Sequence, residues 1–146
     1  MEFHTEELSA QPVVFIRTQT KVTEIGDKIG ECLGQIAPYV GANAAGGPLC
    51  RYNEWDGEGG VMEVAMPVQA PMDAKGNIEA GELPGGKAAV VTHVGAYDGL
   101  AETWEALKGW MAEQKMECRG DPWEQYMDDC TVTPAEKLRT RIVWPI

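Results

Sequence analysis

The sequence has few of the residues that common metal and nucleophile chemistry requires. Its 146 residues include two histidines, His4 and His93, one serine, Ser9, and four cysteines without a Cys-x-x-Cys pair. These counts exclude a histidine-rich metal centre and a serine hydrolase elbow, and they argue against a zinc site or a disulfide framework. No Walker-type or Gly-x-Gly-x-x-Gly loop is present. We therefore expect no metal and no cofactor.

Long apolar runs and an excess of basic charge are also missing. No stretch approaches the roughly 18–20 apolar residues of a membrane span, and residues 1–7 lack the basic and apolar segments of a signal peptide. We expect a soluble cytoplasmic protein without a membrane partner. Its 12 basic and 23 acidic residues give a net charge of −11, which argues against direct nucleic-acid binding and favours cationic ligands. A plainer interpretation is that the acidity only keeps the domain soluble.

What the sequence does contain is one pattern twice. Each half has a β-rich run followed by an amphipathic helix, and each closes with an apolar strand ending near a proline, Pro67 or Pro145, 78 positions apart (145 minus 67). The pattern predicts an α+β domain over residues 1–146 with internal repeats at approximately 10–70 and 79–146. In this architecture two strand-helix-strand-strand repeats form a pseudo-two-fold antiparallel sheet, with helices on one face and a ligand groove at the seam.

Alternation and turn residues give the expected elements. The 69–86 stretch, rich in Pro, Gly and Ala, connects the halves, and a further strand begins near Glu79. Pro38 ends the first helix. The expected strands are Pro12–Gln19, Leu49–Trp55, Val61–Val68, Lys87–Val94, Pro122–Met127 and Leu138–Trp144, and the helices are Val22–Ile36 and Leu100–Met111.

The strongest candidates for function are Glu124 and Tyr126, which share a face of one expected strand. A carboxylate flanked by aromatic residues can bind an organic cation by charge and cation–π attraction, at about 0.5–2 kcal/mol per ring contact. If buried, the same acid can act as a general base. The alternative is that Glu124 faces water on an edge strand.

Other candidates come from both halves. Tyr52 and Trp55 lie on the strand equivalent to that of Glu124, where they either line a facing wall or pack in the core. Glu63 is either a second seam acid, paired with Arg17 or Arg141, or an exposed side chain. Two further tryptophans, Trp104 and Trp110, lie at helical spacing with Leu107 and favour core packing, and His93 is expected to satisfy a turn.

Several segments carry a resemblance to a known family. They are Leu83–Ala88, Thr92–Leu100 (Thr-His-Val-Gly-Ala-Tyr-Asp-Gly-Leu), Trp123–Tyr126 (Trp-Glu-Gln-Tyr) and Thr133–Pro145. The sequence resembles the GyrI-like small-molecule-binding family, which also supplies the effector-binding domain of some AraC- and MerR-type transcription regulators. The resemblance extends over nearly the whole chain and is strongest after Leu83. The chain looks like the stand-alone form.

The resemblance implies a central groove that binds lipophilic, often cationic, aromatic compounds, in a role of multidrug-type effector binding or sequestration. The family's Glu-x-Tyr acid matches Glu124 and Tyr126, with Tyr52 and Trp55 as the best matches for the opposite wall. Trp123 next to the acid would narrow the groove. The implied ligand-binding set is therefore Glu124, Tyr126, Tyr52, Trp55, Glu63 and Trp123.

Ligand binding is the preferred hypothesis for the function, and two alternatives remain. Some relatives resemble hydrolases that open the cyclopropane rings of DNA-alkylating natural products, and in such an enzyme Glu124 would be the catalytic residue. A third possibility is a protein inhibitor of a topoisomerase. The sequence leaves the ligand, the oligomeric state and any protein partner open.

Overall fold

The computed structural model describes residues 2–146. They form two compact units, each a four-stranded antiparallel sheet with one long helix. The first unit is Ala10–Pro84, and the second is Gly85–Ile146 together with the residues up to Ser9. The second unit is thus built from both ends of the chain.

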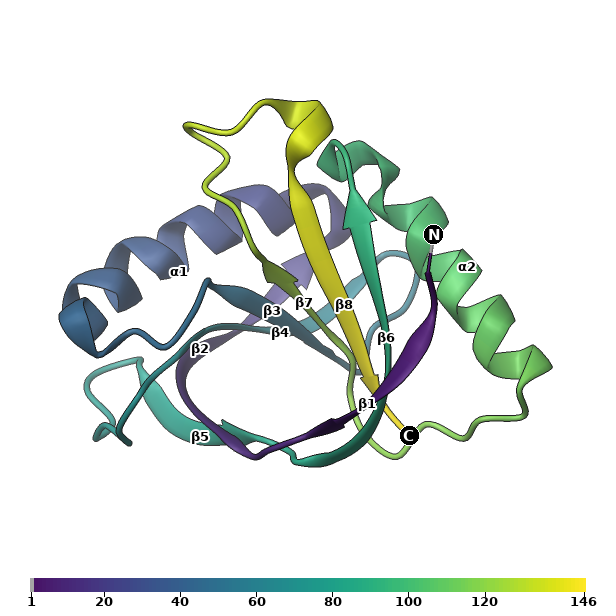
Figure 1. Ribbon diagram of the computed structural model, residues 1–146. Coiled ribbons are helices and arrows are strands. Elements are labelled where there is room, and N and C mark those ends of the chain that lie inside the picture. Colours follow the sequence, from purple (N-terminus) through teal and green to yellow (C-terminus); the bar gives the residue numbers. More distant parts are fainter. Residues whose placement is uncertain (1) are drawn as a thin grey trace. The chain divides into compact units, whose positions relative to one another are not determined.

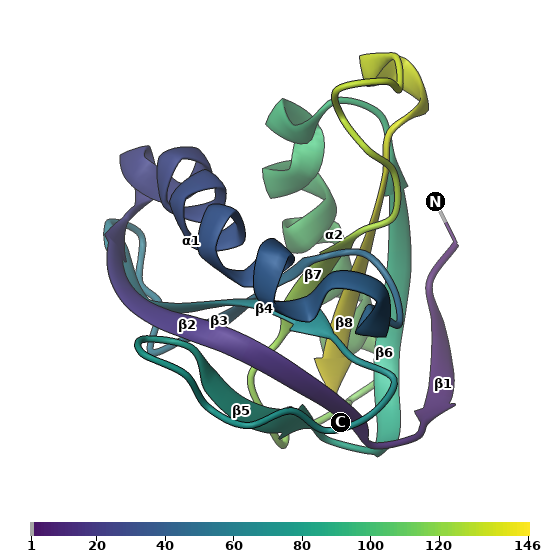
Figure 2. The same cartoon turned by 90° about the vertical axis from the view of Figure 1, so that its left-hand side faces the viewer.

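The first unit orders its strands β5-β2-β4-β3, all antiparallel. Figure 2 shows α1 running over one face of this sheet. Asp56 shapes the β3–β4 turn, because its side chain accepts the backbone N–H groups of Glu58 and Gly59 at 2.7 and 3.1 Å. The elements are β2 (Gln11–Lys21), α1 (Ile25–Val40), β3 (Leu49–Asn53), β4 (Gly59–Pro67) and β5 (Glu79–Leu83), with 3-10 turns at Val22–Glu24 and Gly41–Asn43.

The second unit orders its strands β1-β6-β8-β7, again antiparallel. In Figure 1 the yellow β8 runs next to β6, and α2 follows β6 in the chain. The two units therefore have the same arrangement of strands. In each unit the helix follows the strand that is second in the sheet, β2 in the first unit and β6 in the second. The elements are β1 (His4–Leu8), β6 (Gly86–Val94), α2 (Leu100–Glu113), β7 (Trp123–Tyr126) and β8 (Arg139–Pro145), with 3-10 turns at Tyr97–Gly99 and Ala135–Lys137.

Strand alternation gives each sheet an apolar face for its helix. In the second unit, Val91 and Ile142 pair across β6 and β8 and pack against Leu107 and Met111 of α2. All four side chains are buried, and each contributes about 1.5–3 kcal/mol of hydrophobic stabilisation.

Both helices and the strands of the two repeats appear where the sequence predicts them, and the α+β antiparallel fold class is confirmed. Two details differ. The helix α1 continues through Pro38 to Val40, because a proline in the last turn removes only a bond close to the helix end. The strand β3 stops at Asn53 instead of Trp55, because Glu54 adopts a positive φ of 43° that leaves the extended conformation.

The N-terminal strand β1 has no counterpart among the expected elements. Its residues His4–Leu8 pair with β6, and its acids lie largely exposed at the sheet edge. Across residues 2–146, none of the helices has the length and apolar character needed to span a bilayer.

Candidate functional site

The side chain of Glu124 lies on the helix-covered face of the second unit. Glu124 pairs with Ile142 on β8, and Ile142 packs against α2, so the two side chains share this face. Only 4% of Glu124 is exposed. The expectation of a buried acid is therefore correct at this position, and the alternative of a water-facing edge acid is wrong.

The Glu124 carboxylate accepts hydrogen bonds from two neutral aromatic side chains. The indole Nε1 of Trp104 donates to Oε2 at 3.0 Å, and the Tyr126 hydroxyl donates to Oε1 at 2.7 Å. Trp104 comes from α2, whereas Tyr126 comes from the same strand as the acid. Each carboxylate oxygen thus has a donor from a ring, which fixes the carboxylate among aromatic surfaces.

Further rings extend this arrangement. Tyr97 meets Tyr126 edge-on with centroids 5.6 Å apart, and Trp104 meets Trp144 at 5.7 Å. We call these five residues, Glu124, Tyr126, Trp104, Tyr97 and Trp144, the carboxylate cluster. Burial raises the pKa of Tyr97, and the negative charges of the acids around it, Glu124 among them, raise it further. Tyr97 is also 37% exposed, so it joins the cluster to the surface.

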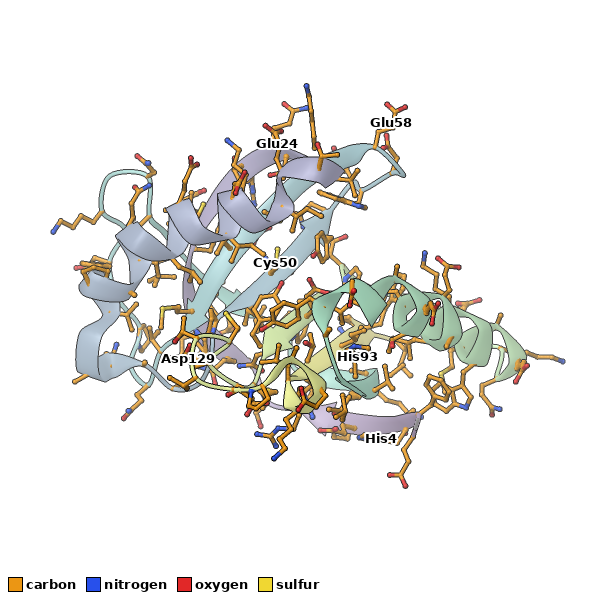
Figure 3. All side chains as sticks on the ribbon, turned by 90° about the horizontal axis from the view of Figure 1, so that it is seen from above. His4, Glu24, Cys50, Glu58, His93 and Asp129 are labelled. Atoms are coloured by element: carbon orange, nitrogen blue, oxygen red, sulfur yellow. The ribbon has the colours of Figure 1, made fainter. Side chains whose placement is uncertain are left out.

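A second set of polar groups follows on the same face. His93 is within hydrogen-bond distance of the Thr103 hydroxyl through Nδ1 (2.7 Å) and of the Ala96 carbonyl through Nε2 (3.0 Å). Figure 3 shows His93 close to the start of α2. The prediction that His93 satisfies a turn is confirmed. Thr140 lies between His93 and Tyr126 in the strand register and is fully buried.

Trp123 does not join the carboxylate cluster. It pairs with Val143, next to Ile142 on β8, so its side chain lies on the face opposite to that of Glu124. Arg141 shares the face of Trp123 and binds both oxygens of Glu6, at 2.9 and 2.8 Å. Trp123 is 4% exposed. Within this unit, Trp123 is therefore not placed to narrow a groove beside Glu124, and its binding role stays a prediction.

The remaining candidates lie in the first unit. Tyr52 and Trp55 meet edge-on with centroids 5.0 Å apart, as expected for neighbouring rings. Glu63 is 3% exposed. Its carboxylate oxygens accept hydrogen bonds from the guanidinium groups of Arg51, at 2.7 Å, and Arg17, at 3.4 Å. The expected pairing with Arg17 is thus found, and Arg51 is a partner that sequence reasoning missed. Arg141, the other partner considered for Glu63, binds Glu6.

Tyr52 and Glu63 point to opposite faces, because Tyr52 pairs with Met62 and Arg51 pairs with Glu63. Binding roles for Tyr52, Trp55 and Glu63 stay predictions, as does the groove at the seam. In the part of the chain that the structure describes, no group of three or more His, Cys, Asp or Glu side chains is placed to hold a metal ion.

Sequence reasoning assigned Trp104 to the core and did not consider Tyr97. The helical spacing of Trp104 indicates burial, but it contains no sign of the indole bond to an acid twenty residues later. Tyr97 could have been found from the Gly-Ala-Tyr-Asp-Gly turn, which already forms part of the family-like segment.

The whole chain, residues 1–146, matches the family described as GyrI-like small molecule binding domain. This chain belongs to the GyrI-like family. No curated protein sequence matches it significantly. The predicted resemblance is confirmed.

Solved structures share the fold at low sequence identity. The crystal structure of the EcmrR C-terminal domain is 20% identical, with a TM-score of 0.84 over 99% of this chain and 96% of that one. The EcmrR–DNA complex gives the same score and identity, but this GyrI-like chain covers only 56% of that longer protein. SAV2435 bound to tetraphenylphosphonium is 19% identical (TM-score 0.72, covering 99% and 93%). A hydrolase from Listeria innocua is 11% identical (TM-score 0.62, covering 99% and 91%).

Proposed function

We propose that this GyrI-like domain binds lipophilic, aromatic organic cations, and that Glu124 is the charged contact. The observation that carries the proposal is a buried carboxylate whose two oxygens accept hydrogen bonds from Trp104 and Tyr126. Both of these donors are neutral groups, and they orient the carboxylate among aromatic rings. An organic cation supplies the opposite charge, and the rings supply cation–π attraction and apolar contact.

Two further observations support a cationic ligand. The net charge of −11 raises the local concentration of cations and disfavours anionic partners, nucleic acids included. SAV2435, a structural neighbour, has been solved with the lipophilic cation tetraphenylphosphonium. That compound is therefore a reasonable first probe for this chain.

The test compares two ions of the same shape and opposite charge, tetraphenylphosphonium and tetraphenylborate, by calorimetry and by tryptophan fluorescence. We expect the cation to bind the wild-type protein more tightly than the anion. The Glu124→Gln variant keeps the size of the side chain but removes the charge. We expect it to weaken phosphonium binding by about 10- to 100-fold, the range for losing a charged contact, with no loss for the borate.

The matched control is Glu105→Gln. Glu105 lies on α2 like Trp104, but its side chain is 75% exposed, and its substitution changes the net charge by the same amount. If both variants weaken phosphonium binding equally, only the overall charge matters. If Glu124→Gln weakens both probes equally, the cation proposal fails.

A hydrolase is the second candidate, and the geometry of the carboxylate is what favours it. An acid held at 2.7 Å from a tyrosine hydroxyl is oriented for general-base activation of water, and one structural neighbour is a hydrolase. Incubation with a cyclopropane-bearing indole, followed by mass spectrometry, separates the two functions. A mass increase of one water that is lost in Glu124→Gln indicates catalysis, whereas tight binding without turnover indicates a receptor.

A further inference from the structure

The hydroxyl of Thr140 is a buried polar group without a hydrogen-bond partner among residues 2–146. Thr140 is 0% exposed. The other four buried polar side chains, Thr20, Glu63, Thr103 and Glu124, all have partners. Burying a hydroxyl without a partner costs about 1–3 kcal/mol, so such a group calls for an explanation.

Thr140 lies on the face that carries the carboxylate cluster. Its register partners are Tyr126 on β7 and His93 on β6, so the three side chains form one row on the helix-covered side. The next row along the strands contains Glu124 and Ile142. Directly opposite residues in antiparallel strands have Cβ atoms about 4.5–5.5 Å apart, so the side chains of Thr140 and Tyr126 begin at neighbouring points on this face.

The neighbours of Thr140 are already engaged. The Tyr126 hydroxyl donates to Glu124, and His93 uses one ring nitrogen on Thr103 and the other on Ala96. The polar groups on both sides of Thr140 thus have hydrogen-bond partners other than Thr140. The Thr140 side chain lies on the same strand face as the carboxylate cluster that we assign to the ligand, and its hydroxyl has no partner there.

We propose that Thr140 is a specificity-determining contact that hydrogen-bonds an oxygen-bearing group, a hydroxyl or a carbonyl, on the cation held at Glu124. The inference rests on the proposed function and narrows its ligand class. The site then recognises two features at once, a delocalised positive charge and an oxygen close to it. A polar group buried without a partner discriminates strongly between ligands that satisfy it and ligands that do not.

Since Thr140 is fully buried, a ligand reaches it only after a neighbouring side chain turns. Tyr126 is the residue directly opposite, and its ring contacts the partly exposed Tyr97. Rotation of these rings is the smallest movement that opens a path from the surface to the hydroxyl.

The experiment uses tetraphenylphosphonium and its three isomers with one hydroxyl on one ring, at the ortho, meta or para position. Each is titrated into the wild-type protein and into Thr140→Val, which removes the hydroxyl and keeps the branched shape. We expect the wild-type protein to bind at least one isomer about 3- to 10-fold more tightly than the parent ion, the range for one hydrogen bond. We expect this preference to disappear in Thr140→Val, with affinity for the parent ion unchanged.

The matched control is Thr20→Val, the same chemical change at a buried threonine of the first unit. It should leave the isomer preference intact. Urea unfolding adds a second readout: Thr140→Val should be at least as stable as the wild type, because it removes an unsatisfied group.

Three outcomes are informative. If the wild-type protein prefers no isomer, or if the preference survives in Thr140→Val, the role of Thr140 is overturned while cation binding stands. If Thr140→Val loses both stability and affinity for every probe, the hydroxyl has a structural role, and the inference fails. If no phosphonium ion binds the wild-type protein, the proposed function itself fails.

Discussion

Each unit buries one acid, but the two acids lie at positions that do not correspond, Glu63 on β4 and Glu124 on β7. In the first unit, Glu63 of β4 lies between Arg51 and Arg17 of the neighbouring strands, and these guanidinium groups neutralise it. In the second unit, Glu124 of β7 faces α2 and is held by neutral ring donors. The same residue type therefore has charged partners in the first unit, whereas in the second unit it accepts hydrogen bonds from two aromatic side chains.

The strand register of each unit shows which residues of the two units occupy corresponding positions. Cys50 pairs with Val64 in the first unit, where Glu124 pairs with Ile142 in the second, so Cys50 occupies the position of the acid. Figure 3 marks Cys50 on β3. One strand later, Glu63 stands where the second unit has Arg141. The shared strand order sets the backbone, and single positions decide which face carries charge.

The largest expected effect comes from moving the acid. Cys50→Glu puts a carboxylate at a position that is 0% exposed, and we expect a loss of more than about 4 kcal/mol or failure to fold at neutral pH. Urea unfolding followed by circular dichroism measures this loss of stability. Cys50→Gln has nearly the same size without the charge, so the difference between the two variants isolates the buried charge. Equal stability of both at pH 7 would contradict the comparison.

Next in size is Glu63→Gln, which leaves two arginines beside a neutral amide. Because Arg17 is about half exposed, water screens part of the loss, and we expect about 2–3 kcal/mol of destabilisation. Tetraphenylphosphonium affinity, measured by calorimetry, should change little. Glu124→Gln should show the reverse, a small stability change with a large loss of affinity. A large affinity loss in Glu63→Gln would remove the distinction between the two acids.

A smaller effect is expected from Trp104→Phe, which keeps a ring but removes the donor to Glu124. Losing this bond should cost about 1–2 kcal/mol of stability and loosen phosphonium binding several-fold. Trp110→Phe is the control, because Trp110 stacks on Phe3 at 5.6 Å, away from the acid. Thermal unfolding and calorimetry on both variants test the assignment, and equal affinity losses would show that only packing matters.

The smallest effect concerns Glu6, the partner of Arg141 in the second unit. Its hydrogen bond to Arg141 lowers the pKa of Glu6 from 4.5 to about 2, with a further contribution from His4. A lowered pKa in the folded state stabilises the protein above the unfolded pKa, and this contribution is lost as the pH falls from about 4.5 towards 2. In urea unfolding, the stability gap between wild type and Glu6→Gln should therefore shrink over that range. A constant gap would exclude the ion pair as its source.

Much of the fold follows from local patterns, and the misses have physical causes. Alternation and helical periodicity located β2, β4, β6, β8 and both helices within a few residues. The strand β1 escaped because His-Thr-Glu-Glu-Leu has no apolar alternation, and only pairing with β6 and the Glu6–Arg141 contact make it extended. Pairing over such a sequence distance is invisible to local propensity.

The site was predictable to the extent that it lies in one short motif. Glu124 and Tyr126 share a face because they are two residues apart on a strand, which the sequence states directly. The donor Trp104 and the unpartnered Thr140 depend on how α2 and β8 approach that strand. Those distances are tertiary, and no spacing in the sequence encodes them.

The placement of β1 has a consequence for how the chain is made. Leu8 and its partner Gly86 are 78 positions apart (86 minus 8), so on a ribosome β1 emerges long before β6 exists. The stretch from Ala10 to Pro84 is continuous and can begin to fold during synthesis, while the leading segment waits without its partner strand. Proteolysis of nascent chains stalled after residue 85 should therefore cleave the segment before Ser9 first and spare the first unit.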